Sequence, residues 1–498
     1  MLKNISKKCF SLANHKPTRT QILIDGKFVN SVSGKTFDVQ NPSNFELLAK
    51  VQEGDKEDVD RAVLSSRKAF DHGPWTNTMT AYERGQVLVK IGDLMEKHRD
   101  ELAALEALDN GKPFHIARAL DLEFAIRTFK YYAGWADKYS GKVISHSFVK
   151  NSLCYTVNDP VGVVGAIIPW NFPILMAAWK LAPALAMGNT MIIKPAEQTP
   201  LSVLRLGELA LEAGVPAGVF NIVPGYGPTA GAALTQHPLV DKVAFTGSTE
   251  VGLNIMRNCH AHRLKRVTLE LGGKSPNIIC EDADMDLAIK QASLALLLNN
   301  GQCCVAGSRT YVHEKIYDEF VHKITEHFAK QKIGNPFDTS SDQGPLVDLD
   351  QHNKYKKYVD LGVKEGAKLN VGGKVPNGKG YFAEPTVFSD VQDNMTIAKE
   401  EIFGPVMSIL KFKTLEDVVH RANNSAYGLG AGVVAKDINT INYLVKNLRA
   451  GQVYVNGYNN FDVSTPFGGF KNSGIGRELG ENGLAQYVEP KTVIIANH

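Results

Sequence analysis

Hydrophobic and polar positions follow two alternating periods between residues 161 and 271. Short apolar runs such as VGVVGAII are each followed by a longer segment with apolar residues every three or four positions. This pattern predicts strands at 161–168, 190–194, 218–223, 241–247 and 266–271, separated by helices at 176–188, 201–214, 228–236 and 248–258. Because parallel strands need crossover connections, five strands and four helices in this order predict a parallel sheet covered on both faces.

A second alternating block begins near residue 277. It predicts helices at 284–298, 315–330, 350–364, 415–424 and 438–449, with strands at 308–313, 430–435 and 452–457. The chain is therefore expected to contain two α/β units. The segment QYVEPKTVIIA at 486–496 predicts an exposed strand, which needs a pairing partner that another subunit could supply.

Capping residues predict where several helices begin and end. Residues 80–108 are expected to form one long helix, closed by Asn110-Gly111 and Pro113. Thr199 is expected to cap a helix that has Pro200 in its first position, and Gly214 is expected to end that helix.

Composition excludes several classes of protein. Of 498 residues, 44% are hydrophobic and 21% charged, which is ordinary for a globular protein, and the net charge of +3 comes without a basic run in the body of the chain. Binding to nucleic acid is therefore not expected. Six cysteines without a CxxC pair indicate free thiols in a reducing compartment. No metal site is expected, because CHAH at 259–262 has no second pair of ligands and is interpreted as a helix end.

One segment resembles a membrane span in composition, and another has the features of a targeting sequence. Residues 160–179 carry no acidic or basic side chain before Lys180, but Pro169, Asn171 and Pro173 would break a spanning helix, so a strand, a turn and a buried helix are predicted instead, and no membrane span is expected. Residues 1–21 are basic and contain no acid, and Leu2, Ile5, Cys9 and Leu12 share one helical face. This favours a mitochondrial presequence over a cytosolic tail.

Two strand ends in the first block could bind a nucleotide. In FTGSTEVG, Gly247 permits a tight turn and Ser248 can cap a helix whose free amides suit a phosphate, although an ordinary strand-to-helix turn would look the same. In IIKPAEQTP, Lys194 and Glu197 lie at the mouth of the sheet. A carboxylate there suits a ribose diol and repels a 2′-phosphate, which favours NAD over NADP; a solvated loop charge is the alternative.

Three other motifs carry groups suited to acyl chemistry. Asn171 in PWNFP is either a structural brace or a donor to an oxyanion. Glu270 in LELGGKSP ends an apolar strand, so it is either paired with a cation or a general base with a raised pKa. Cys303 and Cys304 in GQCC are too close in sequence for an unstrained disulfide, and a cysteine nucleophile would need a base that the sequence alone cannot place.

Taken together, these motifs resemble the NAD-dependent aldehyde dehydrogenase superfamily, especially its tetrameric mitochondrial and cytosolic acetaldehyde and retinal enzymes. PWNFP, KPAEQTP, FTGSTEVG, LELGGKSP, GQCC, EEIFGPV and PFGGFKNSGIGRE occur in the family's order from about Ile22 onward. The resemblance implies a Rossmann-like NAD-binding domain at 22–141 and 161–272, a catalytic α/β domain at 273–472, and a small β oligomerisation arm at 142–160 and 473–498.

The resemblance also implies a role for each site residue. Cys304 matches the nucleophile, Glu270 the base and Asn171 the oxyanion donor. The cofactor NAD is implied to contact Lys194, Glu197, Gly247, Ser248, Trp170, Gln351, Glu401 and Phe403. The tunnel positions for the aldehyde substrate are Phe172, Met176, Trp179, Leu298, Cys303, Phe461 and Phe467.

The resemblance finally implies oxidation of an aldehyde to a carboxylic acid through a cysteine thioester, in a homotetramer. Leu298 replaces the phenylalanine common in acetaldehyde-type members, so activity on longer aldehydes is expected as well. Two alternatives are an NADP-preferring relative and an inactive structural relative. The mitochondrial matrix is the expected location, with the cytoplasm as the alternative.

Overall fold

The computed structural model describes residues 12–145, 147–148 and 151–496. The larger of its two main sheets has eight strands in the order β19-β11-β10-β7-β8-β9-β1-β2. Its members are β1 (Ile22–Ile24), β2 (Lys27–Val29), β7 (Val163–Ile167), β8 (Thr190–Lys194), β9 (Phe220–Ile222), β10 (Lys242–Thr246), β11 (Arg266–Glu270) and β19 (Gly474–Ile475). The five strands expected from the sequence, β7 to β11, run parallel as expected.

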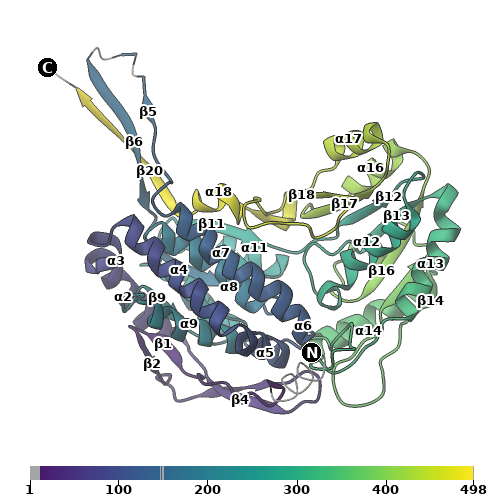
Figure 1. The fold of residues 1–498 in the computed structure, drawn as a ribbon, viewed down its shortest axis with the longest axis horizontal. Coiled ribbons are helices and arrows are strands. Elements are labelled where there is room, and N and C mark those ends of the chain that lie inside the picture. Colours follow the sequence, from purple (N-terminus) through teal and green to yellow (C-terminus); the bar gives the residue numbers. More distant parts are fainter. Residues whose placement is uncertain (1–11, 146, 149–150, 497–498) are drawn as a thin grey trace.

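Helices cover this sheet on both faces (Figure 1). They are α2 (Lys56–His72), α3 (Pro74–Asn77), α4 (Ala81–Lys97), α5 (Arg99–Asp109), α6 (Phe114–Ile116), the π turn η1 (Ala117–Asp121), α7 (Leu122–Trp135), α8 (Pro173–Ala186), α9 (Leu201–Ala213), η2 (Gly227–Gly231), α10 (Ala232–Gln236), α11 (Thr249–Asn258) and α18 (Gly480–Leu484). Every residue of α8 is buried, which confirms that the uncharged segment before it leads into a core helix. No helix among the described residues is long and apolar enough to cross a membrane.

The second sheet has seven strands in the order β14-β15-β16-β13-β12-β17-β18. It consists of β12 (Pro276–Ile279), β13 (Arg309–His313), β14 (Lys368–Val371), β15 (Thr386–Ser389), β16 (Val406–Phe412), β17 (Gly430–Val434) and β18 (Gln452–Val455). Its helices are α12 (Met285–Leu297), η3 (Leu298–Gly301), η4 (Glu314–Ile316), α13 (Tyr317–Ala329), α14 (Leu349–Lys364), α15 (Thr396–Lys399), α16 (Leu415–Asn423), α17 (Ile438–Asn447) and η5 (Lys471–Ser473). The two α/β units expected from the sequence are therefore present.

A narrow three-stranded sheet projects from the body at the upper left of Figure 1. In it, β20 (Val488–Ala496) pairs along its whole length with β6 (Ser152–Pro160), and β6 pairs with β5 (Val143–Ile144). The strand expected at 486–496 therefore finds its partner within its own chain. Residues 474–475, which the sequence-based division placed with this arm, pair instead with β11. A two-stranded sheet of β3 (Thr36–Gln40) and β4 (Leu47–Gln52) completes the strands.

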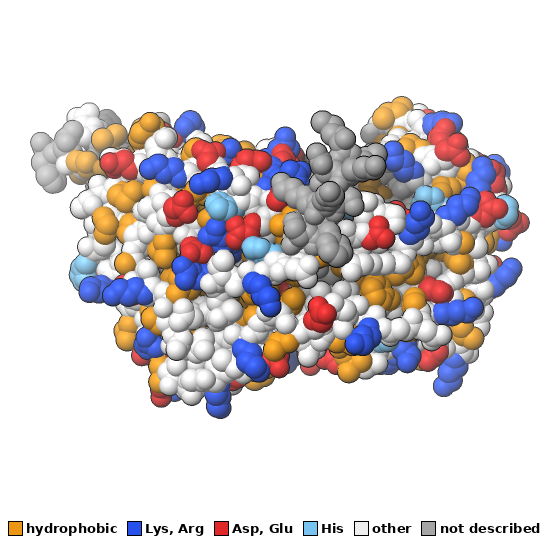
Figure 2. Space-filling view, turned by 60° about the horizontal axis from the view of Figure 1, so that its bottom comes forward, with side chains coloured by type: hydrophobic (Ala, Val, Ile, Leu, Met, Phe, Trp, Pro, Cys, Tyr) orange, Lys and Arg blue, Asp and Glu red, His pale blue; other side chains and the backbone are white. Residues whose placement is uncertain are grey.

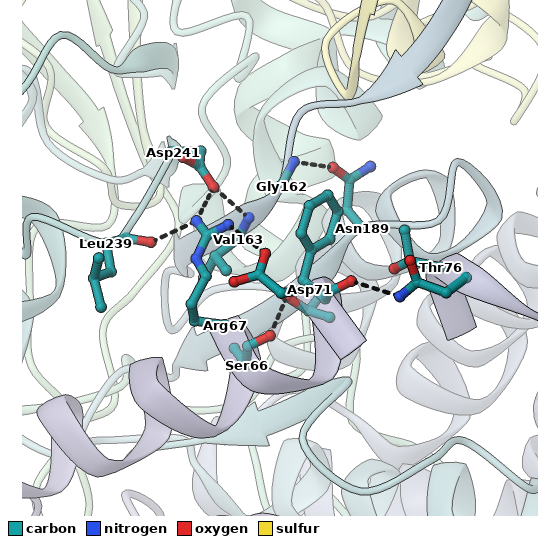
Figure 3. Close-up of polar contacts among 12 residues, drawn as sticks. Ser66, Arg67, Asp71, Thr76, Gly162, Val163, Asn189, Leu239 and Asp241 are labelled. Atoms are coloured by element: carbon teal, nitrogen blue, oxygen red, sulfur yellow. Dashed lines mark hydrogen bonds and ion pairs between the residues drawn. The ribbon is translucent and has the colours of Figure 1, made fainter. Parts of the chain in front are cut away.

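A polar network joins α2 to the starts of two central strands (Figure 3). Arg67 reaches the Asp241 carboxylate and donates to the carbonyl of Leu239 at 2.9 Å, while Asp241 accepts the Val163 amide at 2.8 Å. Gly162 has φ of +129°, and a Cβ there would lie 2.1 Å from Asp241 Oδ2. The network fixes the amino ends of β7 and β10, and so the register of their opposite ends, where the candidate site lies.

Two expected helix boundaries were wrong. The predicted helix at 80–108 is two helices that change direction at His98, whose ψ is +18°. The reason is burial: α4 buries one stripe, whereas α5 is buried all round from Leu102 to Asp109 and must enter the core at another angle. The helix expected from Pro200 begins at Leu201, without a cap from Thr199; the buried Asp109 carboxylate accepts the Leu201 amide at 3.1 Å instead.

Other expected helix ends were confirmed. Gly214 ends α9 with φ of +102°, Ser248 caps α11, and Cys259 follows the last residue of α11. All described cysteines are free, and no cluster suited to a metal ion occurs in the described ranges. Basic and acidic side chains are interspersed on the face shown in Figure 2. The expected presequence falls mainly on residues 1–11, which lie outside the described residues.

Candidate active site

The site lies where the two main sheets meet. In the first sheet the connection order reverses between β7 and β10, and ligands of open α/β sheets bind beside the carboxyl ends at such a reversal. PWNFP follows β7, FTGS ends β10 and Glu270 ends β11. From the second sheet, the loop with Cys303 and Cys304 comes from the amino end of β13.

One cavity gathers nearly all the residues singled out in the sequence. It measures about 1080 Å³ to its open mouth. Its walls contain Trp170, Asn171, Phe172, Met176, Trp179, Gly247, Ser248, Glu270, Leu298, Cys303, Cys304, Gln351, Glu401, Phe403, Phe461 and Phe467. Lys194 and Glu197 lie outside it: Lys194 donates to the carbonyl of Gly225 at 2.6 Å and lies 3.5 Å from the Glu197 carboxylate. Both lie at the carboxyl end of β8, next to β7 in the sheet.

Two consecutive glycines let three reacting or binding groups come together. After Glu270 the chain passes through Gly272 and Gly273 directly into β12. A Cβ on Gly273 would lie 2.3 Å from the carbonyl oxygen of Cys304, and one on Gly272 would lie 2.3 Å from Glu401 Oε2. Glu401 also accepts the Gly273 amide at 2.9 Å. Larger residues at Gly272 or Gly273 would push the loop that carries Cys304 away from the strand that carries Glu270.

The loop before Cys304 has an unusual backbone. Asn299, Asn300 and Gly301 all have positive φ, of 51°, 56° and 70°. Asn is the residue other than Gly that tolerates this region best. Asn300 fixes the turn by donating to the carbonyls of Gly344 and Pro345 at 2.8 and 2.9 Å. The sequence NNGQ therefore produces a tight left-handed turn that presents the two cysteines to the cavity.

Hydrogen bonds of both its side chain and its backbone carbonyl hold Asn171 against this loop. Its side-chain amide donates to the carbonyl of Gln302 at 2.9 Å, and its own carbonyl accepts from Asn299 at 2.8 Å. A carboxamide has two N–H donors, so one remains for a ligand in the cavity. The geometry thus combines the two readings of Asn171, since it is both a brace and a possible donor.

The electrostatics of the cavity raise the pKa of its acids. Burial, together with the nearby Glu478 carboxylate, holds the pKa of Glu270 well above its ordinary value. A hydrogen bond with Cys303, burial and the charges of Glu270 and Glu401 raise the pKa of the Cys304 thiol. Burial also raises the pKa of Glu401. Burial and the neighbouring carboxylates therefore favour the neutral forms of both Cys304 and Glu270.

Three charged residues in or beside the cavity were not singled out in the sequence. Lys180, on α8, donates to Glu478 and to the Thr246 hydroxyl, at 2.6 Å each, and Glu478 lines the cavity. The signal was available for Lys180, since it is the only charge in the apolar helix AAWKLAPALA. Leu120, Lys354 and Asn459 also line the cavity without having been expected there.

Part of the cavity wall is aromatic. Trp179 makes edge contacts with Phe461 and Phe467, with ring centroids 5.8 and 5.0 Å apart. Phe461 also contacts Phe124, outside the expected set, at 4.7 Å. Aromatic walls of this kind accept an apolar substrate while the polar groups stay at one end.

Comparison with known proteins decides the family. Residues 28–493 match the aldehyde dehydrogenase family. The chain belongs to this family. It is 57% identical to the mitochondrial aldehyde dehydrogenase of Homo sapiens over 476 residues, covering 95% of this chain and 92% of that protein. It is 54% identical to retinal dehydrogenase 2 of Homo sapiens, covering 96% and 92%.

Solved structures agree with this assignment. The NAD+ complex of the aldehyde dehydrogenase from Bacillus cereus matches with a TM-score of 0.94 and 49% identity, covering 98% of each chain. The betaine aldehyde dehydrogenase from Staphylococcus aureus with NAD+ matches with a TM-score of 0.95 and 40% identity, covering 99% and 97%. The expected α/β fold class and the expected activity, NAD-dependent oxidation of aldehydes, are therefore confirmed.

Proposed function

We propose that Cys304, Glu270 and Asn171 carry out the aldehyde oxidation of this chain. The observation that supports this most directly is their convergence on one cavity from three separate segments. The Cys304 thiolate attacks the aldehyde carbon, and the developing oxyanion accepts hydrogen bonds from the free N–H of Asn171 and from the Cys304 amide. Each well-placed donor is worth about 3–4 kcal/mol in such a site.

NAD, when bound, accepts the hydride of the tetrahedral adduct, which leaves a thioester on Cys304. Glu270 then takes a proton from the water that attacks the thioester carbonyl, and the acid leaves as Cys304 is released. Ionised Glu270 is needed for this step and also earlier, when it takes the thiol proton of Cys304 before the thiolate attacks; it passes that first proton to solvent before deacylation. Its raised pKa makes it a base strong enough to accept that proton.

The residues expected to hold NAD fit that group. Ser248 caps α11, whose amino end offers free amides to a pyrophosphate. Buried polar atoms without a protein partner in the described part of the chain include Thr249 Oγ1 and Gln351 Oε1, and Gln351 lines the cavity. Lys194 and Glu197 would hold the adenosine ribose, and Glu401 the other ribose. Trp170 and Phe403, in edge contact at 5.3 Å, would pack nearby.

The tunnel supports a substrate class of apolar aldehydes, from short chains to longer or aromatic ones. Phe172, Met176, Trp179, Leu298, Cys303, Phe461 and Phe467 form its wall. Leu298 contributes a smaller side chain than an aromatic residue would at the same place. Relatives named for benzaldehyde and retinal, at 53% and 54% identity, are in keeping with this scope.

We also propose a homotetramer in the mitochondrial matrix. The proposed arm exposes Val143, Ile144, Ile494 and Ile495, and its apolar strands suit pairing with a second copy. The proposed NAD-binding domain is 22–141 with 161–272, the catalytic domain 273–472 and the arm 142–160 with 473–498, except that Gly474 and Ile475 belong to the first sheet. Mitochondrial relatives and the basic start of the chain support the location. Sedimentation and organelle import assays test these two points.

One experiment tests the chemical proposal. A panel of linear and aromatic aldehydes is run with NAD and with NADP on the wild type and on Cys304→Ala, following formation of the reduced cofactor. We expect NAD-dependent turnover that the substitution abolishes. A preference for NADP would contradict the role of Glu197, and turnover by Cys304→Ala would contradict the nucleophile.

A further inference from the structure

Lys112 is a fully buried cation directly behind the candidate site. Its side chain forms an ion pair with Asp121, and neither side chain has any solvent exposure. Its Nζ also donates to the carbonyl of Asn171 at 3.0 Å and lies 4.1 Å from the centre of the Phe172 ring. One ammonium group thus touches the backbone of the proposed oxyanion donor and a ring of the tunnel wall.

The Asn171 carbonyl is the meeting point of several donors. Besides Lys112, it accepts from Asn299 at 2.8 Å and from Asn110 at 3.4 Å, and Asn110 donates to the neighbouring Trp170 carbonyl at 2.8 Å. A carbonyl oxygen has two lone pairs, so this acceptor is saturated. Lys112 supplies the only charge among these donors, and charge-assisted hydrogen bonds are roughly twice as strong as neutral ones.

The counter-ion links the same support to a further residue of the cavity wall. Asp121 closes the π turn η1, and Leu120, the residue before it, lines the cavity. π turns occur often at functional sites because they shift side chains relative to the flanking helix. Through Asp121, the position of Lys112 is therefore tied to Leu120 as well as to Phe172.

We propose that Lys112 is a positioning residue, whose charge holds the Asn171 peptide so that the carboxamide points at the reacting oxygen. A buried ion pair gives little net stability over a well-packed apolar pair, so stability alone does not explain its presence in an apolar wall. The site beside it needs fixed geometry, since small misplacements of reacting groups lower rates severely. This inference rests on the role proposed above for Asn171.

The test removes the charge pair as a unit. Lys112→Met alone leaves Asp121 buried and unpaired, so it is compared with the double variant Lys112→Met/Asp121→Leu, which removes both members of the pair; both variants are also made with Glu106→Gln, because Glu106 is buried beside the pair. Lys265→Met is the matched control, because Lys265 is also buried and donates to two carbonyls, of Thr235 and His237, at 2.7 Å. Melting temperature, kcat and KM for propanal, and NAD affinity are measured for each protein.

We expect the double variant to melt near the wild type and bind NAD normally, while kcat falls by about 10²-fold, the cost of displacing a reacting group by about 1 Å. Lys265→Met should keep the wild-type kcat. A folded double variant with wild-type kcat would overturn the inference, and so would a double variant that does not fold, because the pair would then serve folding. Asn171→Ala separates the two proposals: if it keeps full activity, the role of Asn171 itself is wrong.

Discussion

Lys180 and Glu478 form a buried ion pair behind Glu270, with Lys180 Nζ 2.6 Å from a Glu478 carboxylate oxygen. The pair brings opposite influences to the same base, because the Glu478 charge raises the pKa of Glu270 and the Lys180 charge lowers it. The ionisation of Glu270 is therefore set by residues that the sequence separates widely.

This arrangement predicts how the rate depends on pH. In the mechanism proposed above, Glu270 must be ionised to activate water. Because its pKa lies well above the ordinary value, we expect deacylation to be fast above that raised pKa and to be lost as pH falls through it. Glu478→Gln removes a like charge and should move the acid limb of kcat to lower pH, on the order of one unit. Lys180→Met should move it to higher pH. Profiles of kcat at saturating aldehyde and NAD check both shifts; identical acid limbs in all three proteins would contradict the coupling.

The two adjacent cysteines should differ sharply in function. Cys304→Ala should abolish NADH formation, whereas Cys303→Ala should keep a measurable rate with an altered KM, because Cys303 is proposed to line the tunnel only. Peptide mapping after iodoacetamide treatment should find loss of activity tracking label on Cys304. Inactivation that tracks Cys303 alone would reverse the assignment.

The two consecutive glycines, Gly272 and Gly273, predict that one added methyl group strongly lowers activity or stability. Gly273→Ala places a Cβ 2.3 Å from the Cys304 carbonyl, so the nucleophile loop must move and kcat should fall by about 10²-fold or the fold should weaken. Gly134→Ala is the control, since nothing lies within 4 Å of its Cβ position in α7. That helical substitution should raise stability by about 0.5–1 kcal/mol and leave kcat unchanged. Activity assays and thermal melts distinguish the two.

Leu298 is predicted to set the length of aldehyde that the tunnel accepts. Leu298→Phe adds aromatic volume to a wall that already contains Phe461 and Phe467. We expect kcat/KM for octanal and benzaldehyde to fall by about 10-fold or more, the effect of a few misfitting methylene groups, while acetaldehyde is affected little. An equal loss for every aldehyde, or a wild type restricted to two carbons, would contradict this role.

Glu106 predicts a pH dependence of stability rather than of rate. Burial, with a contribution from Asp121, raises its pKa from 4.5 to about 7 despite the Lys112 charge. The native state therefore favours the protonated form of Glu106. The contribution of this protonation to the stability of the fold, on the order of a few kcal/mol, is complete below about pH 4.5 and is lost as pH rises through about 7. Glu106→Gln should thus gain melting temperature relative to the wild type between pH 5 and pH 8. Exposed Glu212→Gln should show no such trend.

The sequence predicted the repeating architecture well because burial leaves a periodic signature. The strand at 190–194 was predicted to the residue, since TMIIK is uniformly buried between two helices. The helix end at Gly214 was also predictable, because a local left-handed residue stops a helix wherever it occurs. The order of the motifs, through the family that they resemble, then predicted that Cys304, Glu270 and Asn171 belong to one site.

What the sequence could not show depends on contacts between distant segments. Thr199 is a good local cap, yet Asp109 takes that role from 92 residues away. Glu478 and Lys112 influence the site through neighbours that only the folded chain provides. Charges of this kind look like solvated surface residues until their burial is known.

The pairing of β20 with β6 makes a segment in the first third of the chain depend on one made some 330 residues later during synthesis. Until residues 488–496 leave the ribosome, β6 lacks the partner that covers one of its two edges. A nascent or truncated chain therefore exposes that edge of a nine-residue strand, which leads into β7. An unpaired strand edge of this kind promotes association with other unfinished chains. Premature stops before residue 488 should therefore be recovered in the insoluble fraction even though every group proposed for the chemistry has already been translated.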